Sequence, residues 1–344
     1  MENKKSDWVP TNPKYDPEKP MQVGGQAVIE GVMMRSARGI ATAVRRANGD
    51  IVVQKIDHIA ITEHSPLLAL PIIRGAVGLI DMMYLGIKTL NWSAEIAMMD
   101  EEIKTKGSVP AKKRKKGGGA IATGLTLIVA LLLGVGLFFA LPLFVASKLF
   151  AVEQTAVAFN LVAGGIRMCL LLGYMLAISM MEDVKRLFRY HGAEHKSVFA
   201  FELKSELIPG KVKNFSRFHP RCGTSFLLIV VFVAILSFSL IDAVWLTFIG
   251  PITLATRLFV HLPFIPVVGG LAYEMIRFSA KHSTSKWGKI VIAPGLWLQK
   301  ITTKEPDEAQ IEVALVALRC ALGDLDASAF TLKETAAAGS QTNA

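Results

Sequence analysis

TSFLLIVVFVAILSFSLIDAVWLTFIG, residues 224–250, is the stretch that decides the fold class. It holds one charged side chain, Asp242, among 27 residues. A helix of about 20 mainly apolar residues is long enough to cross the hydrocarbon core of a bilayer. A segment in that core must also satisfy its backbone hydrogen bonds internally, as a helix does. The stretch therefore predicts a transmembrane helix.

Three further segments have a similar length and character. They cover residues 120–145, 159–181 and 252–278. Arg167 interrupts the second of them, and the last is weaker because it carries Arg257 and His261. Pro263 and Pro266 lie in that same segment and predict a kink or a break near its middle. We therefore expect a mainly α-helical integral membrane protein with about four transmembrane helices.

Composition agrees with a membrane protein. The 344 residues are 52% hydrophobic and 19% charged, with a mean hydropathy of +0.42 and a formal net charge of +10. Soluble domains carry about 25% charged residues. No basic stretch has the interleaved aromatic residues that a nucleic-acid-binding surface uses. We therefore expect the lipid bilayer, and no nucleic acid, among the partners.

The basic residues also predict an orientation, because Lys and Arg favour the cytoplasmic side of a membrane. KKRKK, residues 112–116, precedes the first apolar segment, and nine Lys and Arg lie in the loop 182–223. The connections at 146–158 and around residue 250 are short and nearly uncharged. A chain path that begins and ends in the cytoplasm places every basic flanking segment on the cytoplasmic side. Both termini and the large loop are therefore expected to be cytoplasmic.

The remaining segments predict smaller units around the membrane domain. The expected division is a disordered tail at 1–21, a cytoplasmic β unit at 22–65, an interfacial helix and basic linker at 66–119, a four-span membrane domain at 120–278, an interfacial segment and C-terminal helix at 279–325, and a second disordered tail at 326–344. The first tail is polar and proline-rich and lacks the apolar core of a signal peptide. The segment 66–98 could alternatively form a fifth spanning or re-entrant element.

Two patterns specify these units more closely. In the β unit, QAVIEGVMMR (26–35) predicts one strand, and residues 41–56 predict a hairpin that turns at Asn48-Gly49. Glu30 interrupts the first strand, either as a solvent-facing residue or as a functional carboxylate. Near the C-terminus, a helix with an apolar stripe is expected to pack on the β unit or the loop; the stripe is Ile311, Leu315, Leu318 and Leu322.

RYHGAEHKSV, residues 189–198, carries the strongest signal for chemistry. On a helix, His191 and His195 lie one turn apart on the same face. Two imidazoles at that spacing can bind one divalent metal ion, and zinc is the ion that this pairing favours. With Glu194 the segment reads H-x-x-E-H, in which the glutamate can act as general base toward water on the metal. The sequence therefore predicts a zinc site with Glu194 as the catalytic residue.

Three other residues are candidate ligands. His219 and Cys222 lie in RFHPRCGTS (217–225), directly before an apolar segment, and Glu274 lies near the end of the last one. A closed structural site would use His191, His195, His219 and Cys222, and an open catalytic site would use His191, His195 and Glu274 with water. Cys222 could instead be a nucleophile activated by a histidine. The alternative without metal is that residues 182–196 continue the second span as a charged helix with ordinary surface pairs.

Five blocks of this sequence carry a resemblance to a known family. They are GGQAVIEGVMMR, YHGAEHKSV, HPRCGTSF, YEMIRF and PGLWLQKITTKEPDEAQIEVAL, and they run in order from about residue 22 to 320. The chain thus resembles the YqhQ-like family of bacterial membrane proteins, a domain of unknown function labelled as a predicted metal-dependent enzyme. The resemblance implies a multi-span protein of the bacterial inner membrane. It directs attention to His191, Glu194, His195, His219, Cys222 and Glu274 and implies no substrate.

Three functions are compatible with these residues. The first is a metal-dependent membrane hydrolase acting on a lipid-linked or membrane-peptide substrate, with Glu274 or His219 as a third metal ligand. The second is a non-catalytic scaffold or membrane-protein biogenesis partner in which a metal only holds the loop to the spans. The third is a transporter, because ionisable residues within spans often line pathways. Those residues are Arg167, Asp242, Arg257 and His261.

Overall fold

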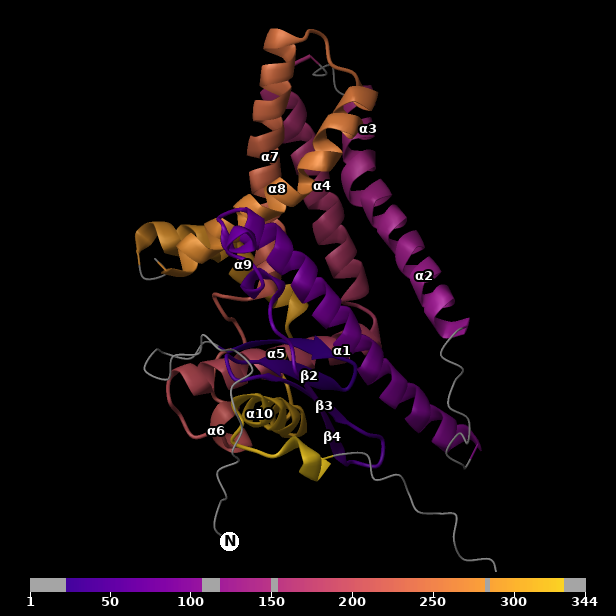
Figure 1. The fold of residues 1–344 in the computed structure, drawn as a ribbon, viewed down its shortest axis with the longest axis vertical. Coiled ribbons are helices and arrows are strands. Elements are labelled where there is room, and N and C mark those ends of the chain that lie inside the picture. The colour runs from indigo at the N-terminus through magenta and orange to yellow at the C-terminus, as the bar shows by residue number, and fades with distance from the viewer. Residues whose placement is uncertain (1–22, 107–117, 150–153, 282–284, 331–344) are drawn as a thin grey trace, which may run out of the picture.

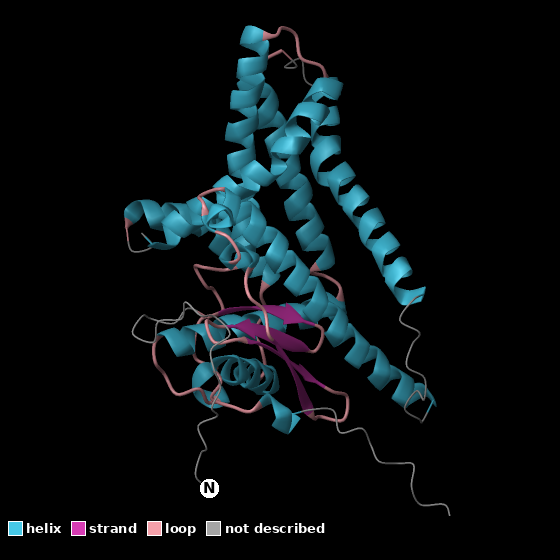
Figure 2. Ribbon diagram, viewed as in Figure 1, coloured by secondary structure: helices cyan, strands magenta, loops and turns pink. Residues whose placement is uncertain are grey.

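The computed structural model describes residues 23–106, 118–149, 154–281 and 285–330. Figure 1 shows a bundle of long helices above a small unit built from a β-sheet and shorter helices. Figure 2 shows that all of the strands belong to this lower unit. Most of the tail at 1–21 and 326–344 and the basic run at 112–116 lie outside the described residues, so those expectations stay untested.

Four stretches of the described chain are long and apolar enough to cross a membrane: Gly124–Leu149, Ala156–Ile178, Phe226–Phe248 and Leu254–Ser279. They belong to α2 (Gly118–Val135) with its continuation through a π-helical turn into α3 (Leu141–Leu149), and to α4 (Ala156–Ile178), α7 (Gly223–Phe248) and α8 (Leu254–Lys281). The expected fold class, a helical membrane protein with a small N-terminal sheet, is confirmed. Of the kink or break expected in the last span, the break is wrong, because α8 continues as one helix through Pro263 and Pro266. The kink stays a prediction. Helix α8 packs against α7 and α1.

The long helix α1 (Ile73–Lys106) is not one of these candidate spans. It runs obliquely from the foot of the bundle past the sheet (Figure 1). It crosses α8 where Gly75 meets Gly270, and a Cβ on Gly75 would lie 2.9 Å from the Gly270 Cα. Small residues allow two helix backbones to approach this closely. The helix therefore ties the membrane bundle to the sheet.

The sheet has four antiparallel strands in sequential order: β1 (Gly24–Val28), β2 (Gly31–Arg35), β3 (Ile40–Arg45) and β4 (Ile51–Ile56). The single strand expected at 26–35 is wrong. Its chain reverses at Glu30, whose φ of 55° is left-handed, so Gln26 pairs with Met33. The hairpin at Asn48-Gly49 is confirmed, with Gly49 at φ 94°.

Both faces of the sheet are buried, because successive side chains of a strand point to opposite faces. On one face, Met33 and Val44 pack with Leu85 and Ile96 of α1. On the other face, Val32 and its neighbours pack on α5 (Glu182–Glu202) and α10 (Glu308–Leu322). The expected apolar stripe of the C-terminal helix is buried there; it is Ile311, Leu315, Leu318 and Leu322. A capping box between Asp307 and Gln310 begins α10, as its acidic first turn suggests.

Helix α5 belongs to this lower unit. The preceding span ends at Ile178, and α5 begins at Glu182 after Met181 adopts an extended backbone. In Figure 1, α5 lies crosswise beneath the spans and against the sheet. The reading of 182–196 as a continuation of the second span is therefore wrong. Burying the apolar face of α5 against β1 and α10 contributes more free energy than continuing the helix along the axis of α4 would.

Candidate metal centre

The helix that carries the two histidines is fixed in place by a close backbone contact. The chain that follows α9 (Lys286–Thr302) crosses α5 at Gly192, where a Cβ would collide with the Lys304 carbonyl oxygen. The Lys304 N–H donates to the Phe188 carbonyl at 2.9 Å. Glycine at position 192 permits this approach, which brings the end of α9 beside His191.

Both histidine rings are oriented by backbone carbonyls. His191 Nδ1 lies 2.8 Å from the Thr302 carbonyl oxygen, and His195 Nδ1 lies 2.5 Å from that of Arg217. A carbonyl oxygen can only accept, so each Nδ1 carries the proton and donates it. Each Nε2 is then unprotonated on the neutral ring and available as a ligand. Hydrogen bonding of the second ring nitrogen to a carbonyl is the usual environment of a metal-binding histidine.

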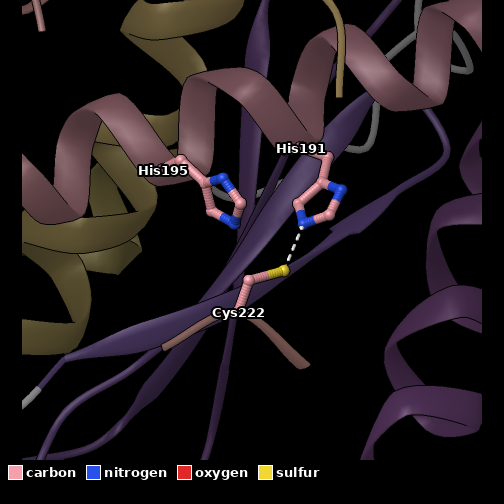
Figure 3. A group of neighbouring side chains, drawn as sticks. All are labelled: His191, His195 and Cys222. Atoms are coloured by element: carbon pink, nitrogen blue, oxygen red, sulfur yellow. Dashed lines mark hydrogen bonds between the residues drawn. The ribbon is translucent and has the colours of Figure 1, made fainter. Parts of the chain in front are cut away.

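The two rings converge on one sulfur (Figure 3). Cys222 Sγ lies 3.3 Å from His191 Nε2, and the ligand atoms of His191, His195 and Cys222 all lie within 4.8 Å of one another. Cys222 is buried at the N-cap of α7, where its sulfur accepts from the Thr224 N–H at 3.4 Å. The positive end of the helix dipole favours negative charge at that sulfur.

These three residues fit zinc. Two imidazole nitrogens and one thiolate are ligands that zinc prefers. With Zn–N near 2.0–2.1 Å and Zn–S near 2.3 Å, tetrahedral geometry places nitrogen and sulfur about 3.5 Å apart. The 3.3 Å between His191 Nε2 and Cys222 Sγ is close to that value. Three protein ligands leave one of four positions for water or substrate, which is the pattern of catalytic zinc sites.

Glu194 lies beside this cluster. Its Oε2 is 3.4 Å from His195 Nε2, and its side chain is only 8% exposed. Burial raises the pKa of the Glu194 carboxyl above its ordinary value, while His191, His219 and the backbone N–H of Gly25 act in the opposite direction. Glycine at position 25 is required here, because a Cβ would lie 2.9 Å from Glu194 Cγ. The carboxyl group is thus held in a dry position next to the candidate ligands.

His219 is close to the cluster but is not one of its three members. Its ring centroid lies 5.7 Å from that of His195, and its Nε2 makes no hydrogen bond, with Glu202 Oε1 at 3.5 Å. The His219 backbone is clamped by Gln299, whose side chain accepts from its N–H at 2.7 Å and donates to its carbonyl at 2.8 Å. Burial lowers the pKa of His219, and the charge of Glu194 opposes that shift.

Glu274 is placed elsewhere. Arg74 of α1 donates to both of its carboxylate oxygens, at 2.6 Å from Nε and 2.5 Å from the terminal nitrogen. A guanidinium that binds both oxygens of a carboxylate is a strong and directional pair. The structure therefore brings His191, His195 and Cys222 together with Glu194 at their side. It uses Glu274 to join α1 to α8.

The residues that orient the histidines have no signal in the sequence. Thr302 and Arg217 act through backbone carbonyls, which every residue possesses. Arg217 also donates from its guanidinium to the Thr303 carbonyl, and this contact holds the loop beside the end of α9. Gln299, which holds the His219 backbone, is buried in the folded chain, and sequence reasoning did not single it out.

Comparisons with known proteins place this chain in context. A family model described as "Protein of unknown function (DUF1385)" matches residues 70–324. The chain is similar to "Uncharacterized protein YqhQ" of Bacillus subtilis (strain 168), with 33% identity over 307 residues, which cover 86% of this chain and 91% of the relative. No solved structure was found to match the chain.

Proposed function

The chain belongs to the DUF1385 family of proteins of unknown function, and from its site geometry we propose that it is a zinc-dependent membrane hydrolase. One observation carries the proposal. Both histidines donate Nδ1–H to backbone carbonyls, which turns both Nε2 atoms toward Cys222 Sγ. An accidental pair of surface histidines has no reason to be oriented in this way.

The proposed reaction is an attack of water on an electrophilic centre. Zinc, when bound, lowers the pKa of water and polarises the bond under attack. His191, His195 and Cys222 would hold the ion, and Glu194 would accept the proton that the attacking water loses. Glu194 can then pass that proton to the leaving group as the bond breaks. Its position 3.4 Å from a ligand nitrogen supports this role.

A non-catalytic scaffold with a structural metal is the alternative. A closed site requires a fourth protein ligand, and His219 is the residue expected to supply it. The backbone of His219 is held by Gln299, and its ring lies outside the group of three converging ligand atoms. This arrangement favours the open, catalytic form of the site.

Replacing Glu194 with glutamine is expected to leave a folded protein that contains metal and has no function. Glutamine keeps an oxygen to accept from Gly25 but cannot accept the proton of water. General acid–base catalysis contributes about 10²–10⁴-fold in rate, so the variant should fail to complement a deletion strain. The measurements are complementation and the metal content of purified protein.

The matched control is Glu206→Gln, which changes an exposed glutamate paired with Lys211 and should complement fully. Full complementation by the Glu194→Gln variant at normal metal content would exclude the hydrolase and favour the scaffold.

We further propose that the protein lies in the cytoplasmic membrane of a bacterium with the sheet unit and both termini inside. The Lys and Arg of the 182–223 loop support this orientation. This loop lies at the end of the bundle that carries the candidate metal centre. A green fluorescent protein fused at the C-terminus should fluoresce, and alkaline phosphatase fused after Ile249 should be active. The reverse pattern would contradict the orientation.

A further inference from the structure

An apolar groove lies between the membrane bundle and α9. It has a volume of about 570 Å³, within the range of about 300–1,000 Å³ that is typical of small-molecule sites. It is bounded by α4, α7, α8 and α9, and its wall includes Met168, Leu228, Phe232, Met275, Trp297 and Ile301. All of the residues that line it are apolar. Such a wall selects a hydrocarbon rather than a polar ligand.

Helix α9 lines this groove on one side and contacts residues of the candidate metal centre on another. It packs against α7, α8 and α4, and in Figure 1 it lies below α7 at the foot of the bundle. Ile290, Pro294 and Trp297 recur at helical spacing and face the groove. Gln299 and Thr302 are fully buried on another side, where they contact the backbone of His219 and the ring of His191. One helix thus shapes the groove and also orients the site.

The depth of the groove suits a lipid whose polar end reaches the site. Leu228 and Phe232 are six and ten residues beyond Cys222 on α7, or about 9 and 15 Å along the axis at 1.5 Å per residue. Ile301, at the α9 side of the groove, directly precedes Thr302. A chain lying in the groove would therefore have its head end near Cys222 and His191.

A third side of α9 carries positive charge. Lys289 and Lys300 are both exposed and lie on the same side of the helix, next to the face that lines the groove. Basic residues at a membrane surface attract anionic lipid headgroups by about 1 kcal/mol each. The groove and these two lysines together match an apolar chain attached to an anionic head.

We propose that this groove binds one acyl chain of an anionic membrane phospholipid and that a lipid of this class is the substrate. The second half of the proposal rests on the proposed hydrolase function, whereas the first half does not. Trp297 is 67% exposed, so the groove opens sideways and a chain can enter from the bilayer.

The test is photolabelling in vesicles of phosphatidylglycerol that contain a small fraction of the same lipid with a diazirine in mid-chain. Mass spectrometry then locates the labelled residues. Label is expected to concentrate on 290–301 of α9 and 228–232 of α7.

Filling the groove with Leu228→Trp or Met168→Trp should reduce that label about tenfold, which corresponds to about 1.4 kcal/mol of binding. Lys289→Gln with Lys300→Gln should remove the preference for phosphatidylglycerol over phosphatidylcholine.

The matched control is Leu132→Trp, which adds the same bulk to an exposed position of α2 and should leave the labelling unchanged. Label spread evenly over all spans, or label unaffected by both groove variants, would overturn the proposal, because it would indicate general contact with surrounding lipid.

The outcome is separable from that of the proposed function, because labelling requires neither metal nor turnover. The Glu194→Gln variant should be labelled like the wild type. Concentrated label in a protein that binds no metal would retain the lipid site and remove the hydrolase. Metal binding without concentrated label would retain the metal centre and remove the lipid groove.

Discussion

Replacing His195 with alanine is expected to abolish stoichiometric zinc binding, lowering the affinity by more than about 100-fold. Loss of an outer partner of a metal ligand already costs about 10–100-fold, and His195 is proposed as a ligand itself. Its Nε2 is one of three ligand atoms within 4.8 Å of one another. The remaining His191 and Cys222 cannot hold zinc with comparable strength, since each coordination bond carries a large share of the binding free energy.

The measurement is metal analysis of purified wild-type and variant protein, followed by zinc titration against a chelating indicator. His191→Ala and Cys222→Ser should behave like His195→Ala, because the three side chains are proposed to bind the same ion. The control is His64→Ala, since His64 is exposed and outside the cluster, with its Nδ1 at 3.2 Å from the Ala60 carbonyl oxygen. Wild-type protein that contains no zinc and binds none on titration would remove the metal centre and the hydrolase together.

A second variant tests whether His219 is a metal ligand. His219→Ala should retain stoichiometric zinc, because the ring of His219 lies outside the group of three. If this variant lost zinc as completely as His195→Ala, His219 would be a fourth ligand, and the site would be closed and structural.

The features that depend on the residues of a single segment were predictable from the sequence. The four spans follow from apolar length alone, and the observed helices begin and end within a few residues of the expected segments. The His191–His195 pair follows from helical spacing, and Cys222 from its position beside His219 just before a span. The stripe of α10 follows in the same way. In each case one segment carries the whole signal.

The parts that failed depend on contacts between distant segments. Glu274 is one of the candidate ligands from the sequence, and a carboxylate near the end of a span needs a partner such as a cation or a metal. The cation is Arg74, 200 residues earlier. The single strand at 26–35 failed because Glu30 adopts a left-handed backbone that its residue type rarely favours. The carbonyls that orient His191 and His195 come from segments that meet only in the folded chain.

Replacing Asp242 with alanine is expected to be the most destabilising single change within the membrane bundle. Asp242 is fully buried in α7, and Arg257 Nε, His261 Nε2 and Asn160 Nδ2 each lie 2.7 Å from one of its carboxylate oxygens. Arg257 and His261 come from α8, and Asn160 comes from α4. Removing one partner of a buried ion pair costs about 3–5 kcal/mol, because an uncompensated charge stays buried. The measurement is thermal unfolding in detergent or in nanodiscs.

The exposed Asp57 offers a matched control, since Asp57→Ala should change the free energy of unfolding by no more than about 0.5 kcal/mol. A smaller loss for Asp242→Ala than for Asp57→Ala would contradict the argument. Three of the four residues behind the transporter hypothesis belong to this cluster, namely Asp242, Arg257 and His261, and a further variant tests that hypothesis. Replacing a buried ionic group by apolar residues of similar volume is often neutral or stabilising. Asp242→Leu combined with Arg257→Met and His261→Phe should therefore recover stability and keep the stacking on Phe238. If that variant also complements a deletion, the cluster only joins three spans. If stability returns without complementation, the buried charges themselves are required, as they would be along a transport path.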